Sequence, residues 1–424
     1  MTKTNQKIPE RWSVTRLELL GEFSKGSGIT KNDLMQNGLP CVRYAELYTK
    51  FDFIIPCCIS FISEETAKTA KPIRIGDILF AGSGETKEEI GKCAVYMNPL
   101  IAYAGGDNII FRTTNVVPLY LSFYLNTLGR KQLNKLGQGD SIVHIHSNDL
   151  KNVIVPLPPL AEQEKIAEIL GCWDDGIEKL SRLIEQKKLL KKGLMQRLLS
   201  GKQRLSGFSE PWSIKKLGEM GKFVSGGTPD TEKSKYWDGN IIWLTPSEIT
   251  KLSTRFVSES ERKITDLGLK NSSAVLLPIG SLIICTRATI GDCCINIKEV
   301  STNQGFKNLI PENSNIDFLY YIISSHKTDL IRRASGSTFL EISKHDIEKL
   351  KYSVPSLSEQ KAIADILSKA DEEIDLLTSK LSALKSQKKG LMQKLLTGQI
   401  RVKVDSAAPL CERSETIQKR QVTE

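Results

Sequence analysis

The sequence predicts an α+β protein made of two related halves, in each of which a globular domain precedes a long helix. The first observation is a long amphipathic segment that begins at Leu160, extends to Leu205 and contains the residues KKGLMQRLLSG. The second is a copy that begins at Leu357, contains KKGLMQKLLTG and extends to about Val402. The copies align without a gap from Leu160 to Gly201, at an offset of 197 residues. Such a repeat predicts a pseudo-two-fold duplication of the chain.

Both segments have the periodicity of a helix that packs against another helix. Their apolar residues alternate at spacings of three and four, a seven-residue repeat that coils two helices around each other in a left-handed sense. About 35 residues at about 1.5 Å each give a rod about 50 Å long. Because such a helix cannot bury its apolar seam alone, we expect the two copies to pair. The predicted seam comprises Ile166, Leu170, Trp173, Ile177, Leu180, Ile184, Leu194 and Leu198 in the first copy, and Ile363, Leu367, Ile374, Leu377, Leu381, Leu384, Leu391 and Leu395 in the second.

The charges of the two segments favour an antiparallel coiled coil. Acidic residues crowd the front of each segment, for example Asp174 and Asp371, and lysines crowd its rear, for example Lys191 and Lys388. This order matches the dipole of each helix. An antiparallel pair lays the acidic front of one helix beside the basic rear of the other, whereas a parallel pair would repel at both ends. The alternative is two solvated amphipathic helices on separate domains.

Composition limits the class of protein. The chain has 424 residues, enough for two or three domains, and its 40% hydrophobic and 25% charged residues are typical of a globular protein in water. No apolar run approaches the roughly 20 residues that cross a bilayer, and the start MTKTNQKIPERW lacks the apolar core of a signal peptide. The nine cysteines, none at zinc-ligand spacing, predict buried free thiols in a reducing, cytoplasmic setting. The net charge of +10 favours a polyanionic partner.

The globular parts, roughly residues 8–155 and 208–353, share landmarks. Each opens with a tryptophan and a short amphipathic element, and each has two Gly-led apolar strands in its middle. One helix stands out in each part, near Pro118 and near Asp317, and the short β-rich runs between predict a mainly antiparallel sheet. The expected boundaries are residues 1–155 for the first domain, 156–205 for the first long helix, 206–353 for the second domain, 354–403 for the second long helix, and 404–424 for a disordered tail.

The sequence contains no convincing catalytic constellation. The GSGE run at Gly82 is too short for a phosphate loop and lacks its Lys-Ser/Thr. His144 and His146 alternate on a predicted strand and should face the same side, but with no third ligand they are better explained as structural histidines. The PDTEK run at Pro229 has the composition of a turn. The motif with which amino-methyltransferases act on a flipped base is also missing. We therefore expect neither an active site nor a metal site.

The loops instead predict a binding surface, because basic and aromatic residues alternate there with small polar ones. Arg, Asn, Gln, Ser and Thr read base edges, while Lys and Arg on phosphates fix the register. Arg255 belongs to this group of loops, and Trp237 and Trp243 could be either core or surface. The candidate DNA contacts are Lys25, Lys31, Arg43, Tyr44, Ser83, Glu85, Thr86 and Lys87 in the first domain, and Thr228, Lys235, Tyr236, Thr245, Ser247, Thr286 and Arg287 in the second.

In these features the chain resembles the specificity subunit of a type I restriction-modification system. The twin helices carry the resemblance most specifically, with Glu-Gln at Glu162 and Glu359 and the shared KKGLMQ ends. Further support comes from VRYAELYT at Val42, AGSGETKEEIGK at Ala81 and the long run GGTPDTEKSKYWDGNIIWLTPSEI at Gly226.

One stretch departs from the family pattern. The second domain has Asn303-Gln-Gly-Phe, which is similar to family members, whereas the first has Gly105-Gly-Asp-Asn. We therefore expect the two domains to differ in detailed fold or loop length and to recognise different half-sites.

The resemblance implies two target recognition domains that each read one half of a split DNA site, with the paired helices as a ruler between them. It also implies docking of two modification (methyltransferase) subunits, which bring S-adenosylmethionine, and of restriction (motor-nuclease) subunits, which use ATP and Mg²⁺. This chain would carry no cofactor and no metal and would not be an enzyme. Two alternatives stay open here: a coiled-coil scaffold whose domains bind proteins, and an enzyme with a degenerate site.

Overall fold

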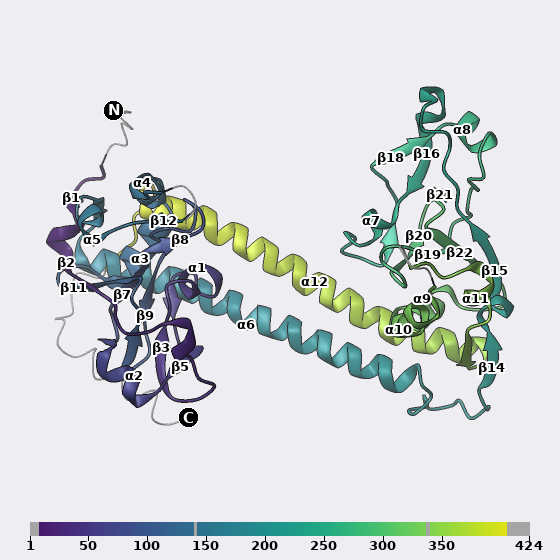
Figure 1. Cartoon of the computed structure of the whole chain (residues 1–424), viewed down its shortest axis with the longest axis horizontal. Helices are drawn as coiled ribbons and strands as arrows, with labels where there is room; N and C mark the ends of the chain where they lie inside the picture. Colours follow the sequence, from purple (N-terminus) through teal and green to yellow (C-terminus); the bar gives the residue numbers. More distant parts are fainter. Residues whose placement is uncertain (1–7, 140–141, 336–339, 405–424) are drawn as a thin grey trace. The chain divides into compact units, whose positions relative to one another are not determined.

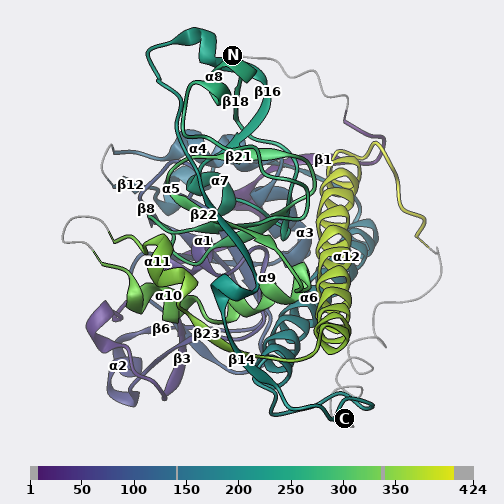
Figure 2. The same cartoon turned by 90° about the vertical axis from the view of Figure 1, so that its right-hand side faces the viewer.

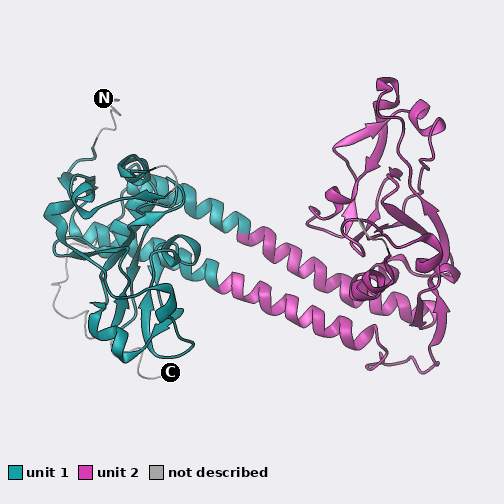
Figure 3. Cartoon of the chain, viewed as in Figure 1, with its two compact units in different colours: residues 1–178, 382–424 teal, residues 179–381 magenta. Residues whose placement is uncertain are grey.

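The computed structural model describes residues 8–139, 142–335 and 340–404 (Figure 1; Figure 2 gives a second view). The chain divides into two compact units, residues 1–178 with 382–424 and residues 179–381 (Figure 3). Each unit thus combines one globular domain with a part of each long helix. All but the first residue of the expected tail, 404–424, lies outside the described residues. Over the described ranges, no helix is both long enough and apolar enough to cross a bilayer.

The first unit is built on two sheets. The larger sheet has five strands in the order β2-β11-β7-β9-β4, and the smaller has four in the order β5-β3-β10-β6. Two short pairs, β1-β13 and β12-β8, complete the strands of the unit. The strands are β1 (Ser13–Arg16), β2 (Gly21–Lys25), β3 (Leu39–Val42), β4 (Ile54–Ile55), β5 (Ser60–Ile62), β6 (Lys71–Ile73), β7 (Ile78–Ala81), β8 (Ser83–Gly84), β9 (Cys93–Tyr96), β10 (Ala102–Ala104), β11 (Asn108–Thr113), β12 (Val143–His144) and β13 (Ile154–Leu157).

The second unit repeats this plan with fewer strands. Its five-stranded sheet has the order β15-β22-β19-β20-β17, its second sheet has only three strands in the order β18-β16-β21, and β14 pairs with β23. The strands are β14 (Ser213–Lys216), β15 (Gly221–Ser225), β16 (Trp237–Leu244), β17 (Phe256–Val257), β18 (Arg262–Ile264), β19 (Leu282–Cys285), β20 (Cys293–Asn296), β21 (Val300–Thr302), β22 (Phe306–Pro311) and β23 (Lys351–Val354).

The five-stranded sheets correspond strand for strand, which confirms the predicted duplication. In both, the last strand pairs in parallel with its neighbour, β4 with β9 and β17 with β20, while the other pairs are antiparallel. Each smaller sheet also holds one parallel pair, β3 with β10 and β16 with β21. The prediction of mainly antiparallel sheets is therefore correct for both domains.

Short helices surround these sheets. In the first unit they are η1 (Leu17–Leu20), η2 (Lys31–Asp33), α1 (Glu46–Thr49), α2 (Glu64–Thr69), α3 (Pro118–Asn126), α4 (Arg130–Leu136) and α5 (Ser147–Leu150). In the second unit they are η3 (Leu217–Glu219), η4 (Ser234–Tyr236), α7 (Pro246–Ile249), α8 (Asp266–Lys270), α9 (Ile316–Ser325), α10 (Lys327–Arg333) and α11 (Lys344–Glu348).

The single helix expected near Pro118, and again near Asp317, is wrong, since each is split in two. In the first unit α3 ends at Asn126 and α4 begins at Arg130. The hydroxyl of Thr127, which follows α3, donates a hydrogen bond of 2.6 Å to the carbonyl of Phe123. A hydroxyl that bonds back to the preceding turn competes with continuation of the helix. In the second unit His326 separates α9 from α10.

The long helices are α6 (Leu160–Leu198) and α12 (Leu357–Leu396). Both begin at the first residue of the repeated segments, Leu160 and Leu357, and both end several residues before those segments do. Gly201 and Gly398 follow the two ends with φ of 69° and 68°. Glycine adopts this left-handed conformation without steric cost and so terminates a helix. The repeated residues KKGLMQ(R/K)LL(S/T)G therefore contain their own helix stop.

The two helices run antiparallel, as their charges predict. In the first unit Lys388 on α12 pairs with Asp174 on α6, and in the second Lys191 on α6 pairs with Asp371 on α12. Members of these pairs are related by the offset of 197 residues: Asp174 to Asp371, and Lys191 to Lys388. Figure 2 shows α6 and α12 side by side. Lys191 and Lys388 interrupt the apolar seam of their helices, and each pairs across it with an aspartate of the other helix.

A second repeated contact ties the start of each long helix to the chain that follows the other helix. In the first unit Arg401 donates to the Glu162 carboxylate at 2.7 and 2.8 Å, and Trp12 donates to it at 3.3 Å. In the second unit Glu359 accepts equivalent bonds from Arg204 and Trp212. Since both carboxylates are buried, these bonds supply the partners that a buried charge requires.

The helix ends belong to the domain cores. Ile166 and Leu170 of α6 and Leu395 of α12 lie in the main core of the first unit, while Ile363 and Leu367 occupy the equivalent place in the second. Every residue of the predicted seam is buried or half-buried. The helices are therefore extensions of the two cores and not separate solvated rods.

Two further expectations need correction. Cys57 and Cys172 are exposed, so the described cysteines are not all buried, although none of them forms a disulfide. The loop at Gly105 joins β10 to β11 through three residues, as does the loop at Asn303 between β21 and β22. The loops therefore have equal length, and the expected difference in detailed fold lies in the smaller sheets, with four strands against three.

Candidate nucleic-acid interface

In the first unit, Gln138 and His144 pair through their backbones beside β8, the short strand that follows β7. The backbone amides and carbonyls of Gln138 and His144 bond to each other at 2.9 and 2.8 Å, and β12 pairs with β8 so that His144 lies opposite Ser83. The side chains of Ser83 and His144 share a hydrogen bond of 2.9 Å between Oγ and Nδ1. Residues that are 61 positions apart in the chain are thereby brought together at one strand end.

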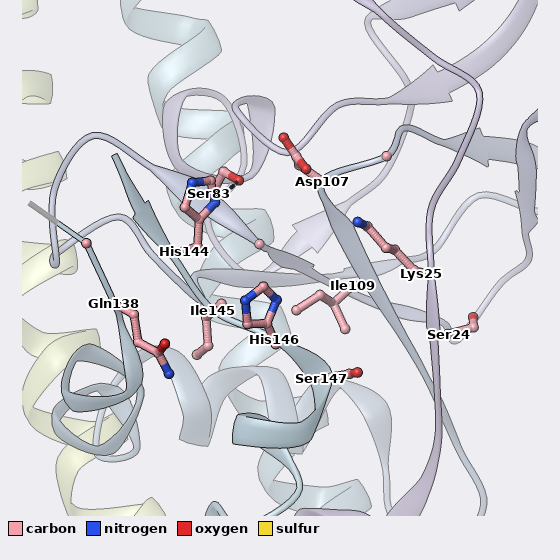
Figure 4. Close-up of a pocket in the computed structure, with 13 residues that line it drawn as sticks. Ser24, Lys25, Ser83, Asp107, Ile109, Gln138, His144, Ile145, His146 and Ser147 are labelled. Carbon is pink, nitrogen blue, oxygen red and sulfur yellow. Dashed lines mark hydrogen bonds between the residues drawn. The ribbon is translucent and has the colours of Figure 1, made fainter. Parts of the chain in front are cut away.

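A hollow of about 530 Å³ lies beside this contact (Figure 4). Its polar lining includes Lys25 at the end of β2, Asp107 between β10 and β11, His144 on β12, and His146 just before α5. Both histidines line the same hollow, as their alternation predicts. Across the parts of the chain that the structure describes, no group of three or more metal-binding side chains is found.

The second unit has the same backbone arrangement with charged side chains. Ser335 and Glu341 bond to each other through the backbone, and Glu341 lies opposite Arg287, which follows β19. Ser335 and Glu341 follow Gln138 and His144 by 197 residues. The Arg287 guanidinium contacts the Glu341 carboxylate at 2.7 Å, where the first unit has serine and histidine. The same strand end thus carries different chemistry in the two units.

A lysine lies near each of these two strand ends, but on strands that do not correspond: on β2 in the first unit and on β22 in the second. In the first unit Lys25 on β2 faces Ile109 on β11, and in the second Ser225 on β15 faces Lys307 on β22. The Lys307 ammonium lies 3.5 Å from the Glu341 carboxylate, and its side chain is only 11% exposed. Burial opposes ionisation of Glu341, but Arg287 and Lys307 outweigh it and hold the pKa of Glu341 below its usual value.

In the second unit, aromatic residues hold the loop between β15 and η4, residues 226–233, in place. The rings of Trp237 and Trp243 meet edge to face at 5.0 Å, and the Arg262 guanidinium lies 3.7 Å from the centre of the Trp237 ring. Trp243 donates from Nε1 to the carbonyl of Gly227 at 2.9 Å. Both tryptophans are buried, so they position the loop as core residues.

Five candidate contacts of the first domain lie on β2, on β8 or in the segment that follows β8. Glu85, Thr86 and Lys87 follow β8, and the Glu89 carboxylate accepts from the backbone amides of Glu85 and Thr86 at 2.9 and 3.2 Å. Lys25 and Ser83 both line the hollow, but Ser83 is buried.

Three other candidates of the first domain lie on different elements. Lys31 is exposed at the start of η2, while Arg43 and Tyr44 are half-buried just before α1. The Tyr44 ring lies 6.3 Å from that of Tyr48 on α1.

Four candidates of the second domain keep a polar group at the surface. Thr228 bonds to Gln304 of the β21-β22 loop, Ser247 and Lys235 are exposed, and Arg287 is 45% exposed. Thr245 is half-buried and caps α7, because its backbone amide and hydroxyl both donate to Glu248, at 2.7 and 2.6 Å.

Two candidates are turned inward in this structure. Thr286 is fully buried, and its hydroxyl donates to the carbonyl of Gly305 at 3.1 Å. Tyr236 is 7% exposed and packs with Trp237. Arg255, from the same group of loops, pairs with Asp317 at 3.2 Å and with Asp371 of α12 at 3.6 Å, so it fastens a loop to the helix.

Sequence reasoning missed Lys307, Glu341 and Gln138 as members of these sites. Lys307 lies on the largely buried strand β22, and the mostly apolar sequence of this strand does not indicate that its lysine belongs to a site. His144 and Glu341 occupy matching positions of the repeat, and this match is the signal that could have revealed the pair.

Two related domains and a pair of antiparallel helices, with matched polar positions at one strand end of each domain, define a duplicated binding protein. The family described as "Type I restriction modification DNA specificity domain" matches the chain twice, over residues 9–187 and 209–386. The chain therefore belongs to the type I restriction-modification DNA specificity family.

Similar proteins extend over nearly the whole chain. The putative type I restriction enzyme MjaX specificity subunit of Methanocaldococcus jannaschii is 27% identical over 417 residues, which cover 94% of this chain and 95% of that protein. The EcoR124I/EcoR124II specificity subunit of Escherichia coli is 32% identical over 276 residues, covering 62% of this chain and 65% of that protein. The crystal structure of the type I restriction-modification S subunit from M. genitalium has a TM-score of 0.61 at 18% identity, covering 93% and 97% of the two chains, and so shares the fold.

Proposed function

We propose that this specificity subunit reads an asymmetric, bipartite DNA site, with one domain for each half-site. The observation that carries the proposal is the matched strand end, which bears Ser83 and His144 in one domain and Arg287 and Glu341 in the other. The two domains share a backbone arrangement at this strand end but carry different hydrogen-bonding groups. This suits two domains that approach DNA in the same way and select different bases.

Charge supports DNA as the ligand. The chain has a formal net charge of +10, and lysines such as Lys25, Lys31 and Lys235 are exposed on the two domains. Lysines on phosphates contribute affinity and register without sequence information, while the matched strand ends would supply the base contacts.

We further propose that α6 and α12 set the spacing between the half-sites. A helix of 39 or 40 residues is about 60 Å long at about 1.5 Å per residue. Ten base pairs of B-DNA span about 34 Å, so helices of this length suit half-sites about one turn or more apart. The paired helices also offer two related faces, which suits the docking of two methyltransferase subunits and, through them, of restriction subunits.

In this proposal the chain itself is not a catalyst. Its partners would bring S-adenosylmethionine for methylation, and ATP with Mg²⁺ for restriction. The proposed functional boundaries are residues 1–155 and 206–353 for the recognition domains and residues 156–205 and 354–403 for the helical spacers.

Selection from a random duplex library tests this function. The full chain, purified with methyltransferase subunits, should enrich two short motifs separated by a constant unread spacer. Its affinity for the selected duplex should fall steeply with salt, because phosphate contacts release counterions. A protein-binding scaffold would enrich no motif, and that result would overturn the proposal.

A further inference from the structure

Arg287 and Glu341 form a built contact at the end of β19. Their side chains are 45% and 32% exposed, so both are accessible from solvent while they remain paired at 2.7 Å. Lys307 approaches the same carboxylate from the neighbouring strand at 3.5 Å. The cluster of two cations and one carboxylate has a net charge of +1, which suits contact with DNA.

The backbone around Arg287 fixes the position of its side chain. Thr286 before it donates to Gly305 from both its backbone amide, at 2.8 Å, and its hydroxyl, at 3.1 Å. Ala288 after it has a φ of 58°, a left-handed conformation that is costly for a residue with a Cβ. Thr289 closes the turn by donating to the Arg287 carbonyl at 2.7 Å. Strained backbone of this kind persists where the surroundings over-determine a position.

The exposed part of the Arg287 side chain is available to a ligand. Arginine has five N–H donors in a planar fork, and the side chain is 45% exposed while its Nη2 lies 2.7 Å from the Glu341 carboxylate. A guanidinium held by a carboxylate on one edge can present another edge to a guanine, whose N7 and O6 both accept in the major groove. Glu341 would therefore limit rotation of the fork while Arg287 makes the contact.

We propose, as a refinement of the function proposed above, that Arg287 reads a guanine in the half-site of the second domain and that Glu341 is the positioning residue that orients it. Ser83 and His144 occupy this place in the first domain and offer no guanidinium. At this strand end the arginine–guanine contact is therefore confined to one half-site, and it contributes to the asymmetry of the whole site.

The test compares base preferences of the full chain with its methyltransferase subunits, using selection from random duplexes. Arg287→Lys keeps the charge but loses the planar fork, so it should reduce discrimination at one G·C pair of the second half-site by about 10- to 100-fold. Glu341→Gln keeps the shape and should weaken the same base position by a smaller factor. Arg16→Lys makes the same chemical change on exposed β1 of the other unit and should leave both motifs intact.

The pattern across base positions decides the result, with thermal unfolding measured for each variant to confirm folding. A uniform loss over all sequences with Arg287→Lys would identify a phosphate contact and overturn the guanine assignment. An equal loss at every position of the half-site with Glu341→Gln would make its role purely structural and overturn the positioning role. A wild-type protein that selects no bipartite site would instead refute the proposed function itself, so the two failures are distinguishable.

Discussion

Lys388 of α12 is 5% exposed, and its ammonium pairs with Asp174 of α6. The same ammonium lies 4.4 Å from the centre of the Phe53 ring and 5.0 Å from that of Phe123. A lysine in an apolar seam is costly unless it is paired, and here a carboxylate and two aromatic faces supply the partners. A polar pair at such a position fixes the register of two helices, because any other register leaves a charge buried and unpaired.

Lys388→Ala should lower the free energy of unfolding by about 1–3 kcal/mol, because Asp174 loses its partner. This loss of stability is smaller than that expected for a fully buried pair, because the Asp174 side chain is 28% exposed. Urea unfolding of the full chain measures it. Lys389→Ala, at the adjacent exposed position, is the matched control and should change stability by less than about 0.5 kcal/mol. Equal effects of the two substitutions would contradict the role of the pair.

The pKa of Glu341 gives a prediction about pH. Burial opposes its ionisation, yet Arg287 and Lys307 lower its pKa below the reference of 4.5. An acid with a lowered pKa in the folded state contributes stability above its unfolded pKa and loses it as pH falls through the folded value. The stability difference between wild type and Glu341→Gln should therefore be constant near neutral pH and shrink below about pH 4.5. Unfolding curves at several pH values check this, and a difference that grows with acidity would contradict it.

Leu377→Asp should disrupt the helix pair. Leu377 is half-buried on the seam, and an aspartate there would bury a charge without a partner. If the helices dock the methyltransferase subunits, the variant should lose both in copurification, as should Leu180→Asp. Leu376→Asp is the matched control, because Leu376 is 71% exposed. Recovery of two methyltransferase subunits with Leu377→Asp at the wild-type ratio would rule out this docking model.

Arg43→Ala should affect only the half-site read by the first domain. The Arg43 side chain is half-buried before α1, and its backbone amide donates to the Glu46 carboxylate at 3.2 Å. A bidentate base contact would cost about 1–3 kcal/mol at one position of that motif. Base preferences from duplex selection report the change, with Arg16→Lys as the control. Equal weakening for all sequences would assign Arg43 to a phosphate.

The spacing of the half-sites should follow the length of the helices. Four residues inserted into each helix, after Glu178 and after Leu381, lie at the boundaries of the compact units and preserve the pairs within each unit. They add about 6 Å, close to two base pairs at about 3.4 Å each. The expected methylation pattern has unchanged half-sites and a spacer longer by one or two base pairs, measured by sequencing modified adenines.

A one-sided insertion is the control for the ruler. Four residues added to α6 alone, after Leu190, would displace Lys191 from Asp371 and destabilise the second unit. It should abolish or weaken recognition without giving a new spacer. An unchanged spacer with the double insertion would refute the ruler.

The sequence by itself determined the duplication, the two long helices and their antiparallel pairing. The seven-residue apolar repeat and the separation of charge can be read along each helix by itself. The constant offset is read by aligning the two copies. The Lys388 interruption of the seam was visible in the sequence, and its complement Asp174 was visible in the acidic front of the other copy.

Only the tertiary structure decided which polar groups meet at the candidate interface. Ser83 and His144 are 61 residues apart, and Arg287 and Glu341 are joined by an isolated bridge between distant segments. It also turned Thr286 inward and fastened Arg255 to α12. Strand pairing over such distances depends on register and on packing against the whole sheet, and a one-residue slip would exchange every inward side chain for an outward one. No local pattern carries that information.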